Sequence, residues 1–104
     1  MAITQYEIDT YFLFHMTDNF GQSTIINCYG VGALKGALYF YKEGTTFPVS
    51  SKSSSGSLSL RFRESQLAEI LATLRHEKPL YVWFDDSSQF GGLKTSAEPV
   101  GEEE

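Results

Sequence analysis

Residues Ser57–Asp86 read SLSLRFRESQLAEILATLRHEKPLYVWFDD, a stretch that predicts a strand, a helix and a second strand in succession. At its start, apolar Leu58, Leu60 and Phe62 alternate with polar side chains. This period of two places one side of a strand against a core and turns the other side toward water.

The hydrophobic period then changes to that of a helix. Apolar residues fall at i, i+3, i+4 and i+7, which forms a single stripe along one helix side. This stripe consists of Leu67, Ile70, Leu71 and Leu74. Ser65 is expected to cap the start of the helix, because its hydroxyl can accept a hydrogen bond from a free amide of the first turn. Pro79 disfavours helical geometry at the residue before it and marks the exit.

The second strand follows Pro79 and ends at two aspartates. Leu80, Val82 and Phe84 share one side of this strand, so Tyr81 and Trp83 must share the other. The sequence from Asp85 to Ser88 predicts strand termination and a turn.

The chain before this stretch predicts further strands. From Gln5 to Met16 the even positions are apolar apart from Thr10, and the odd positions become apolar toward the end, so we expect one long strand. Two more strands are expected over residues 24–33 and 37–42. Residues 45–49 are expected to form a short edge segment, and the serine-rich run 50–55 a mobile loop.

Together these elements predict an α+β fold in one domain. We expect a mostly antiparallel sheet of about five strands with a single helix packed on one face, in the order β-β-β-β-α-β. The domain is expected to span residues 1–95, with an acidic C-terminal tail over residues 96–104. No internal repeat is visible.

A single helix covers only one face of a sheet, which leaves the opposite face to be explained. Tyr81 and Trp83 are expected there, and by the same alternation Tyr39 and Tyr41 can join them. Monomers rarely leave a large aromatic patch bare, and Tyr and Trp are favoured at protein interfaces. We therefore expect a homodimer that associates through these four residues. The alternatives are that the serine-rich loop or the tail covers this face, or that the sheet curls into a half barrel.

Composition excludes several classes of protein. The net charge is −5, and four of the acids lie in the last nine residues, which leaves nine acidic against eight basic residues elsewhere. This near-neutral body argues against nucleic-acid binding. No apolar run has membrane-spanning length, the start lacks the regions of a signal peptide, and the single cysteine rules out an intrachain disulfide. A cytoplasmic location is the default expectation.

Catalytic signals are weak, and a non-enzymatic module is favoured over an enzyme. The two histidines, His15 and His76, are far apart in sequence, and no Cys or His pair has ligand spacing, so neither a metal nor another cofactor is expected. Cys28 is expected to be an inert buried thiol. The alternative function is that of a small-ligand-binding protein or enzyme, with a pocket near His15, Asp85 and Asp86.

Two short segments carry a resemblance. The sequence from Leu74 to Tyr81 (LRHEKPLY) and the tail EPVGE at residues 98–102 are similar to those of small uncharacterised bacterial proteins, some of the kind carried as mobile gene cassettes. The resemblance implies a bacterial, cytoplasmic, stand-alone protein. It implies no known activity and carries over no site residue.

Overall fold

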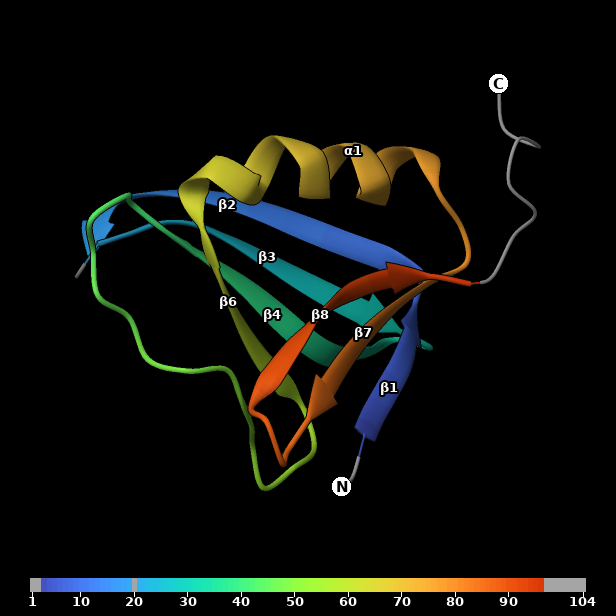
Figure 1. Ribbon diagram of the computed structural model, residues 1–104. Helices are drawn as coiled ribbons and strands as arrows, with labels where there is room; N and C mark the ends of the chain where they lie inside the picture. The colour runs from blue at the N-terminus through green and yellow to red at the C-terminus, as the bar shows by residue number, and fades with distance from the viewer. Residues whose placement is uncertain (1–2, 20, 97–104) are drawn as a thin grey trace.

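The computed structural model describes residues 3–19 and 21–96, and its chain order is six strands, one helix and two strands (Figure 1). A single 3-10 turn, η1 (Glu64–Gln66), precedes the helix. The elements are β1 (Ile3–Ile8), β2 (Thr10–Asn19), β3 (Gln22–Gly30), β4 (Ala33–Tyr41), β5 (Ser51–Lys52), β6 (Leu58–Arg63), α1 (Leu67–His76), β7 (Leu80–Asp85) and β8 (Phe90–Thr95).

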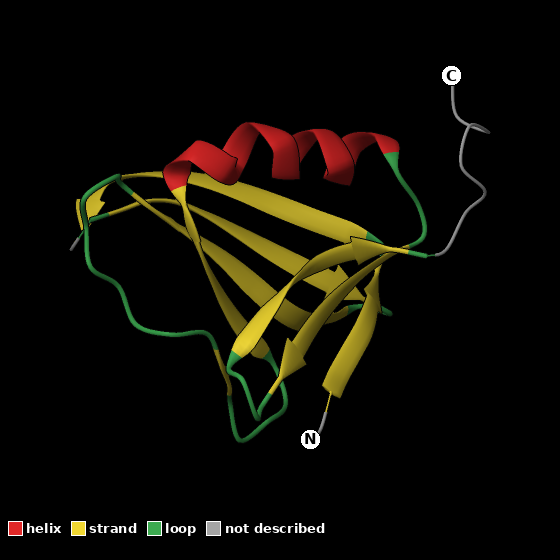
Figure 2. Ribbon diagram, in the orientation of Figure 1, coloured by secondary structure: helices red, strands yellow, loops and turns green. Residues whose placement is uncertain are grey.

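The strands form two sheets. One sheet has three strands in the order β1-β7-β8, and the other has five in the order β2-β3-β4-β6-β5. All neighbours are antiparallel except β4 and β6, which are parallel. This arrangement confirms the predicted α+β class, the single helix and the mostly antiparallel pairing (Figure 2). The described residues hold eight strands, and the strands on either side of the helix belong to different sheets.

The prediction of one long strand over residues 5–16 is wrong, because the chain turns a corner at Asp9. The backbone amide of Asp9 donates to the Tyr29 carbonyl at 2.8 Å, and the Asp9 carboxylate accepts from the Val31 amide at 3.2 Å. A Cβ at Gly30 would collide with the Glu7 carbonyl, so the absence of a side chain there lets the corner close. β1 therefore enters one sheet and β2 the other.

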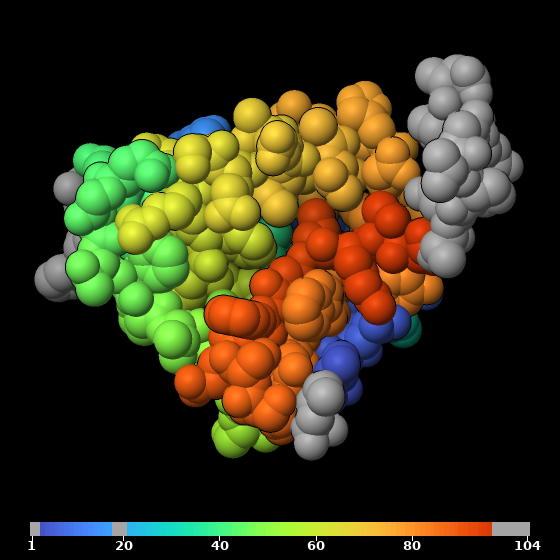
Figure 3. All heavy atoms as spheres, in the orientation of Figure 1, coloured from blue at the N-terminus to red at the C-terminus, as the bar shows by residue number. Residues whose placement is uncertain are grey.

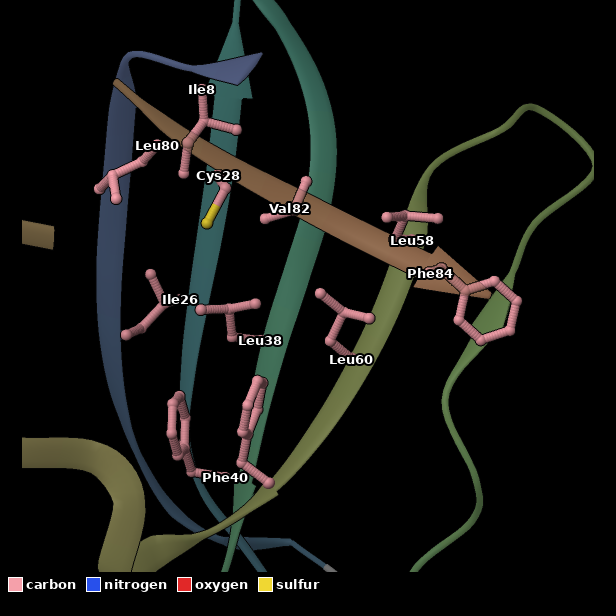
Figure 4. Close-up of a cluster of buried hydrophobic side chains, with 11 residues drawn as sticks. Ile8, Ile26, Cys28, Leu38, Phe40, Leu58, Leu60, Leu80, Val82 and Phe84 are labelled. Atoms are coloured by element: carbon pink, nitrogen blue, oxygen red, sulfur yellow. The ribbon is translucent and has the colours of Figure 1, made fainter. Parts of the chain in front are cut away.

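The core lies between the two sheets. Figure 4 shows β7 crossing the strands of the five-stranded sheet, with Leu80, Val82 and Phe84 following one another along it. These three side chains are 5%, 0% and 4% exposed. Two crossed sheets that are joined at a corner of the chain commonly enclose a small β core. The buried cluster consists of Ile8, Ile26, Cys28, Leu38, Phe40, Leu58, Leu60, Phe62, Leu80, Val82 and Phe84.

The helix closes the remaining part of this core. Its predicted stripe, Leu67, Ile70, Leu71 and Leu74, packs against the buried cluster. Basic side chains occupy the last turn, as the helix dipole favours. The expected Ser65 cap is wrong: Ser65 lies inside η1, and its amide donates to a carboxylate oxygen of Glu43 at 3.0 Å. The Gln66 side chain instead accepts from the Arg63 amide at 3.2 Å.

The segment between β4 and β6 is largely exposed but is anchored to the strands at several points. The short strand forms at Ser51–Lys52, not at residues 45–49, and it pairs with β6. Ser50 is buried, and its hydroxyl accepts from the Arg61 amide at 3.1 Å. The Tyr6 hydroxyl donates to the Gly56 carbonyl at 2.8 Å and ties the far end of this segment to β1. The predicted acidic tail lies, apart from Ser96, outside the described residues.

A candidate interaction surface

The outer face of the five-stranded sheet points away from the core and is rich in aromatic side chains. The register places Phe14 beside Ile25, Ile25 beside Tyr39, and Tyr39 beside Arg61 across four strands. A second row begins with Phe12 beside Asn27. Figure 3 shows the opposite side of the molecule, where α1, β7 and β8 lie in front of strands β2 to β4.

Two phenylalanines of β2 dominate the exposed part of this face. Phe12 is 59% exposed and Phe14 is 45% exposed. Their ring centroids lie 6.2 Å apart, and the Phe12 ring meets the Tyr29 ring edge to face at 6.0 Å. Tyr29 pairs with Leu34 of β4, which is also 45% exposed. We call the side chains of Phe12, Phe14, Ile25, Tyr29, Leu34 and Tyr39 the aromatic surface.

The predicted residues Tyr39 and Tyr41 do lie on this face, but the segment after β4 covers Tyr41. The Phe47 ring stacks on the Tyr41 ring at 4.6 Å, and Tyr41 is only 3% exposed. Tyr39 is half-buried, and the Arg61 guanidinium lies 5.1 Å from its ring centroid. Tyr41 is therefore closed to a partner.

Two arginines hold the covering segment in place. Arg61 donates to the Tyr41 hydroxyl at 2.9 Å and to the Val49 carbonyl at 3.1 Å. Arg63 donates to the Thr45 carbonyl at 2.5 Å, and its guanidinium lies 4.6 Å from the Phe47 ring centroid. A planar guanidinium can stack on a ring and donate at its edge at the same time. One end of the outer face is thus closed and the β2 end is open.

Tyr81 and Trp83 lie on the other sheet, so the expectation that four aromatic residues share one face is wrong. Both point away from the core from β7, as their alternation predicted, but β7 pairs with β1 and β8. Trp83 lies opposite Gly92, and a Cβ at Gly92 would stand 3.5 Å from the indole nitrogen. The indole ring therefore lies against the backbone of Gly92, which has no side chain, and Trp83 is half-buried.

The alternative ligand site is not brought together by the fold. His15 is exposed on β2 and pairs with Thr24 in the five-stranded sheet. Asp85 ends β7 in the three-stranded sheet, beside Ile3 and Phe90, and Asp86 follows it in the turn. Within residues 3–19 and 21–96, no group of three or more His, Cys, Asp or Glu side chains could hold a metal ion. No helix in those ranges is long and apolar enough to cross a membrane.

A hollow of about 790 Å³ lies elsewhere, between the corner at Asp9 and the end of the helix. Its walls are residues 7–11 on one side and residues 74–80 on the other, and they include Tyr11, Arg75, His76 and Lys78. Neither His15 nor Asp85 lines it. The Asp9 carboxylate at its edge already accepts from the Thr10 hydroxyl and the Val31 amide.

The Asp85 carboxylate confirms the predicted turn. One of its oxygens accepts from the Ser87 hydroxyl at 2.8 Å and from the Ser87 amide at 3.0 Å. These hydrogen bonds favour the ionised form and hold the pKa of Asp85 below its ordinary value of 3.8. Asp85 therefore organises the β7–β8 turn.

A pH titration checks this role of Asp85. Because the folded pKa is lowered, the stabilisation by the carboxylate is present above the unfolded pKa and is lost as pH falls through the folded pKa. An NMR titration of the Asp85 carboxyl carbon should give a midpoint below 3.8, and Ser87→Ala should raise that midpoint. A midpoint that Ser87→Ala leaves unchanged would contradict the assignment.

Cys28 is the buried thiol that the sequence predicted. It is fully buried in β3, and burial raises the pKa of its thiol to about 12. At pH 8 about one thiol in ten thousand is then ionised, and the thiolate is the reactive form. Iodoacetamide labelling followed by mass spectrometry should be at least about a hundredfold slower in native protein than in urea. Equal rates in the two conditions would show that the thiol is accessible.

Comparisons with known proteins give no further guide to this surface. No family model, curated protein or solved structure matches the chain. The resemblance to bacterial gene-cassette proteins therefore stays a prediction.

Phe12 and Phe14 are the surface residues that sequence reasoning missed. Their even positions continue the apolar alternation of Tyr6 and Ile8, which do face the core. The corner at Asp9 reverses that parity, because in β2 the core contacts come from Tyr11 and Leu13. The signal that could have found them was the rise of apolar character at the odd positions after Asp9.

Proposed function

We propose that this protein is a non-enzymatic assembly module that self-associates through the aromatic surface. The observation that carries the proposal is the adjacency of Phe12 and Phe14, 59% and 45% exposed, at the open end of the outer sheet face. Contiguous exposed aromatic side chains of this kind are typical of protein interfaces.

The size of the exposed area indicates a weak dimer. A phenylalanine side chain offers about 200 Å², so the exposed parts of Phe12 and Phe14 amount to about 200 Å² per chain and about 400 Å² in a twofold dimer. At about 25 cal/mol per Å², burial of this area is worth about 10 kcal/mol, against an association cost of about 4–15 kcal/mol. Burial of Tyr29 and Leu34 would add to the favourable free energy of association. At the lowest association cost the balance is about −6 kcal/mol, so we expect a dissociation constant of tens of micromolar.

The Trp83 side of the molecule supports this proposal less well. Trp83 and Tyr81 are half-buried within their own sheet, whereas Phe12 is mostly exposed. Ile3 and Phe90 are exposed at the end of that sheet, on either side of Asp85. A charged carboxylate between two apolar side chains is costly to bury in an interface.

Size-exclusion chromatography with light scattering tests the proposal. Between about 1 and 500 μM, a range that brackets a dissociation constant of tens of micromolar, the mass should rise from 11.7 kDa toward twice that value. A constant mass of one chain over the whole range would overturn it.

Binding of a small ligand is a second candidate function, and the hollow at the helix end supports it. Arg75, His76 and Lys78 line this hollow together with the carboxylates Glu7, Asp9 and Glu77 and the apolar Leu74 and Leu80, a mixture of both charges that suits a zwitterionic organic molecule. A thermal-shift screen of small zwitterionic compounds should then show stabilisation that His76→Ala removes. No stabilisation by any compound would reject this candidate.

A further inference from the structure

The strand that carries Phe12 and Phe14 is also a free sheet edge. β2 stands at one end of the five-stranded sheet, and among the described residues it pairs only with β3. It is ten residues long. An edge strand turns alternate backbone amides and carbonyls away from its sheet, where a further strand can pair with them.

The other three edges carry features that discourage such pairing. β5 has only two residues, one of them Lys52. β1 carries Glu7, and β8 carries Lys94 and two adjacent glycines. Short length, charged side chains and bulges are the usual means by which proteins protect sheet edges.

β2 lacks these features over most of its length. Residues 10–17 contain no Lys, Arg, Asp, Glu or Pro. A register irregularity begins only after His15, so the regular part of the edge runs from Thr10 to His15. This is the segment that bears the exposed phenylalanines.

We propose that a second copy of this chain docks on this edge, so that the two β2 strands pair antiparallel about a twofold axis and the two sheets become one. The inference rests on the proposed self-association and adds its geometry. The argument for a second copy, rather than another protein, is that β2 is nearly symmetric about Leu13. Phe12 and Phe14 lie at equal distances from it, as do Tyr11 and His15, and the pairing opposes no like charges.

The pleat restricts the register of this pairing. Residues directly opposite in a sheet share a face, so an outer side chain must oppose an outer side chain. With Leu13 on the axis, Phe12 of each copy stands opposite Phe14 of the other. Directly opposed aromatic side chains, with Cα atoms about 4.5–5.5 Å apart, are favourable cross-strand pairs. With Phe12 on the axis, Phe14 would instead oppose Thr10, so the first register is the better one.

Hydrogen exchange of the wild-type protein tests the inference. At about a hundred times the dissociation constant, roughly one chain in ten remains monomeric, so amides covered in the dimer should exchange about tenfold more slowly than in the monomer. Edge pairing predicts this slowing at alternate amides between Tyr11 and His15, because the intervening amides already bond to β3. Packing of two sheet faces predicts no such alternation.

Cysteine cross-linking gives a second, independent readout. In the preferred register Leu13→Cys places two thiols within disulfide range across the axis, and the variant should form a covalent dimer under mild oxidation. Asn27→Cys, on the outer face of β3 and one strand away from the edge, is the matched control and should not cross-link. The native Cys28 is buried and does not interfere.

The outcomes separate the inference from the proposal on which it rests. Alternate protection in β2, or cross-linking of Leu13→Cys without cross-linking of Asn27→Cys, supports edge pairing. A dimer without alternate protection overturns edge pairing but leaves self-association standing. A monomer at every concentration overturns both. If Leu13→Cys fails to fold, the exchange experiment on the wild-type protein decides alone.

Discussion

Replacement of both Phe12 and Phe14 by serine should shift the protein strongly toward the monomer. The change removes four rings from a twofold dimer, whose exposed parts total about 400 Å² and are worth at most about 10 kcal/mol when fully buried. Even a quarter of that value raises the dissociation constant at least about fiftyfold. Sedimentation equilibrium of the variant and the wild-type protein measures the difference directly.

The Phe12/Phe14 variant needs a control that is equally exposed but lies elsewhere. Phe90 is 72% exposed on β8, in the other sheet, so Phe90→Ser changes surface hydrophobicity without touching the aromatic surface. Circular dichroism should show a folded chain for both variants, since neither change empties the core. If Phe90→Ser dissociates the dimer and the Phe12/Phe14 variant does not, the interface lies on the three-stranded sheet.

Gly91→Ala should strongly destabilise the fold, whereas Gly92→Ala should not. A Cβ at Gly91 would stand 2.5 Å from the Trp83 carbonyl oxygen and 2.7 Å from a Leu60 methyl carbon, where the two sheets meet. A Cβ at Gly92 would find its nearest neighbour, the Trp83 indole nitrogen, at 3.5 Å, which is ordinary contact. Overpacking of this kind costs about 1–3 kcal/mol, or about 10 °C in Tm for a domain of this length.

The two glycine variants form a matched pair because the same methyl group is added at neighbouring positions of one strand. Any general effect of Gly→Ala on the unfolded chain is common to both, and it favours stability by about 0.4–1 kcal/mol. Thermal unfolding followed by circular dichroism should therefore give a Tm for Gly92→Ala at or above that of the wild-type protein. Equal losses in both variants would mean that the sheets do not meet at Gly91.

Local elements of the fold could be predicted from sequence because their signals are periodic. The alternation of Leu58, Leu60 and Phe62 and the helical stripe beginning at Leu67 each face the core as expected. The outward direction of Tyr81 and Trp83 also followed from alternation. These features depend on side-chain direction within one element, which a short stretch of sequence determines.

The division into two sheets could not be predicted, because it depends on the corner at Asp9. Extended residues lie on both sides of that corner, and apart from Thr10 the even positions stay apolar through it. Only the approach of Gly30 to the Glu7 carbonyl and the hydrogen bonds of Asp9 show that the chain bends there. Such contacts join residues distant in sequence and leave little periodic signal.

The sequence predicted the aromatic character of the candidate surface but not the residues that form it. The sequence indicated an aromatic outer face, yet Tyr41 is covered by Phe47, and Tyr81 and Trp83 belong to the other sheet. The covering depends on Arg61 and Arg63, which reach residues 12 to 18 positions away in sequence.

The most direct test of self-association through the aromatic surface is an isotope-filtered NOE experiment on a mixture of labelled and unlabelled protein. Such a spectrum records only contacts between different copies of the chain. We expect intermolecular NOEs to the ring protons of Phe12 and Phe14. Intermolecular NOEs confined to Trp83, Ile3 and Phe90, or none at concentrations where light scattering shows a dimer, would contradict the account.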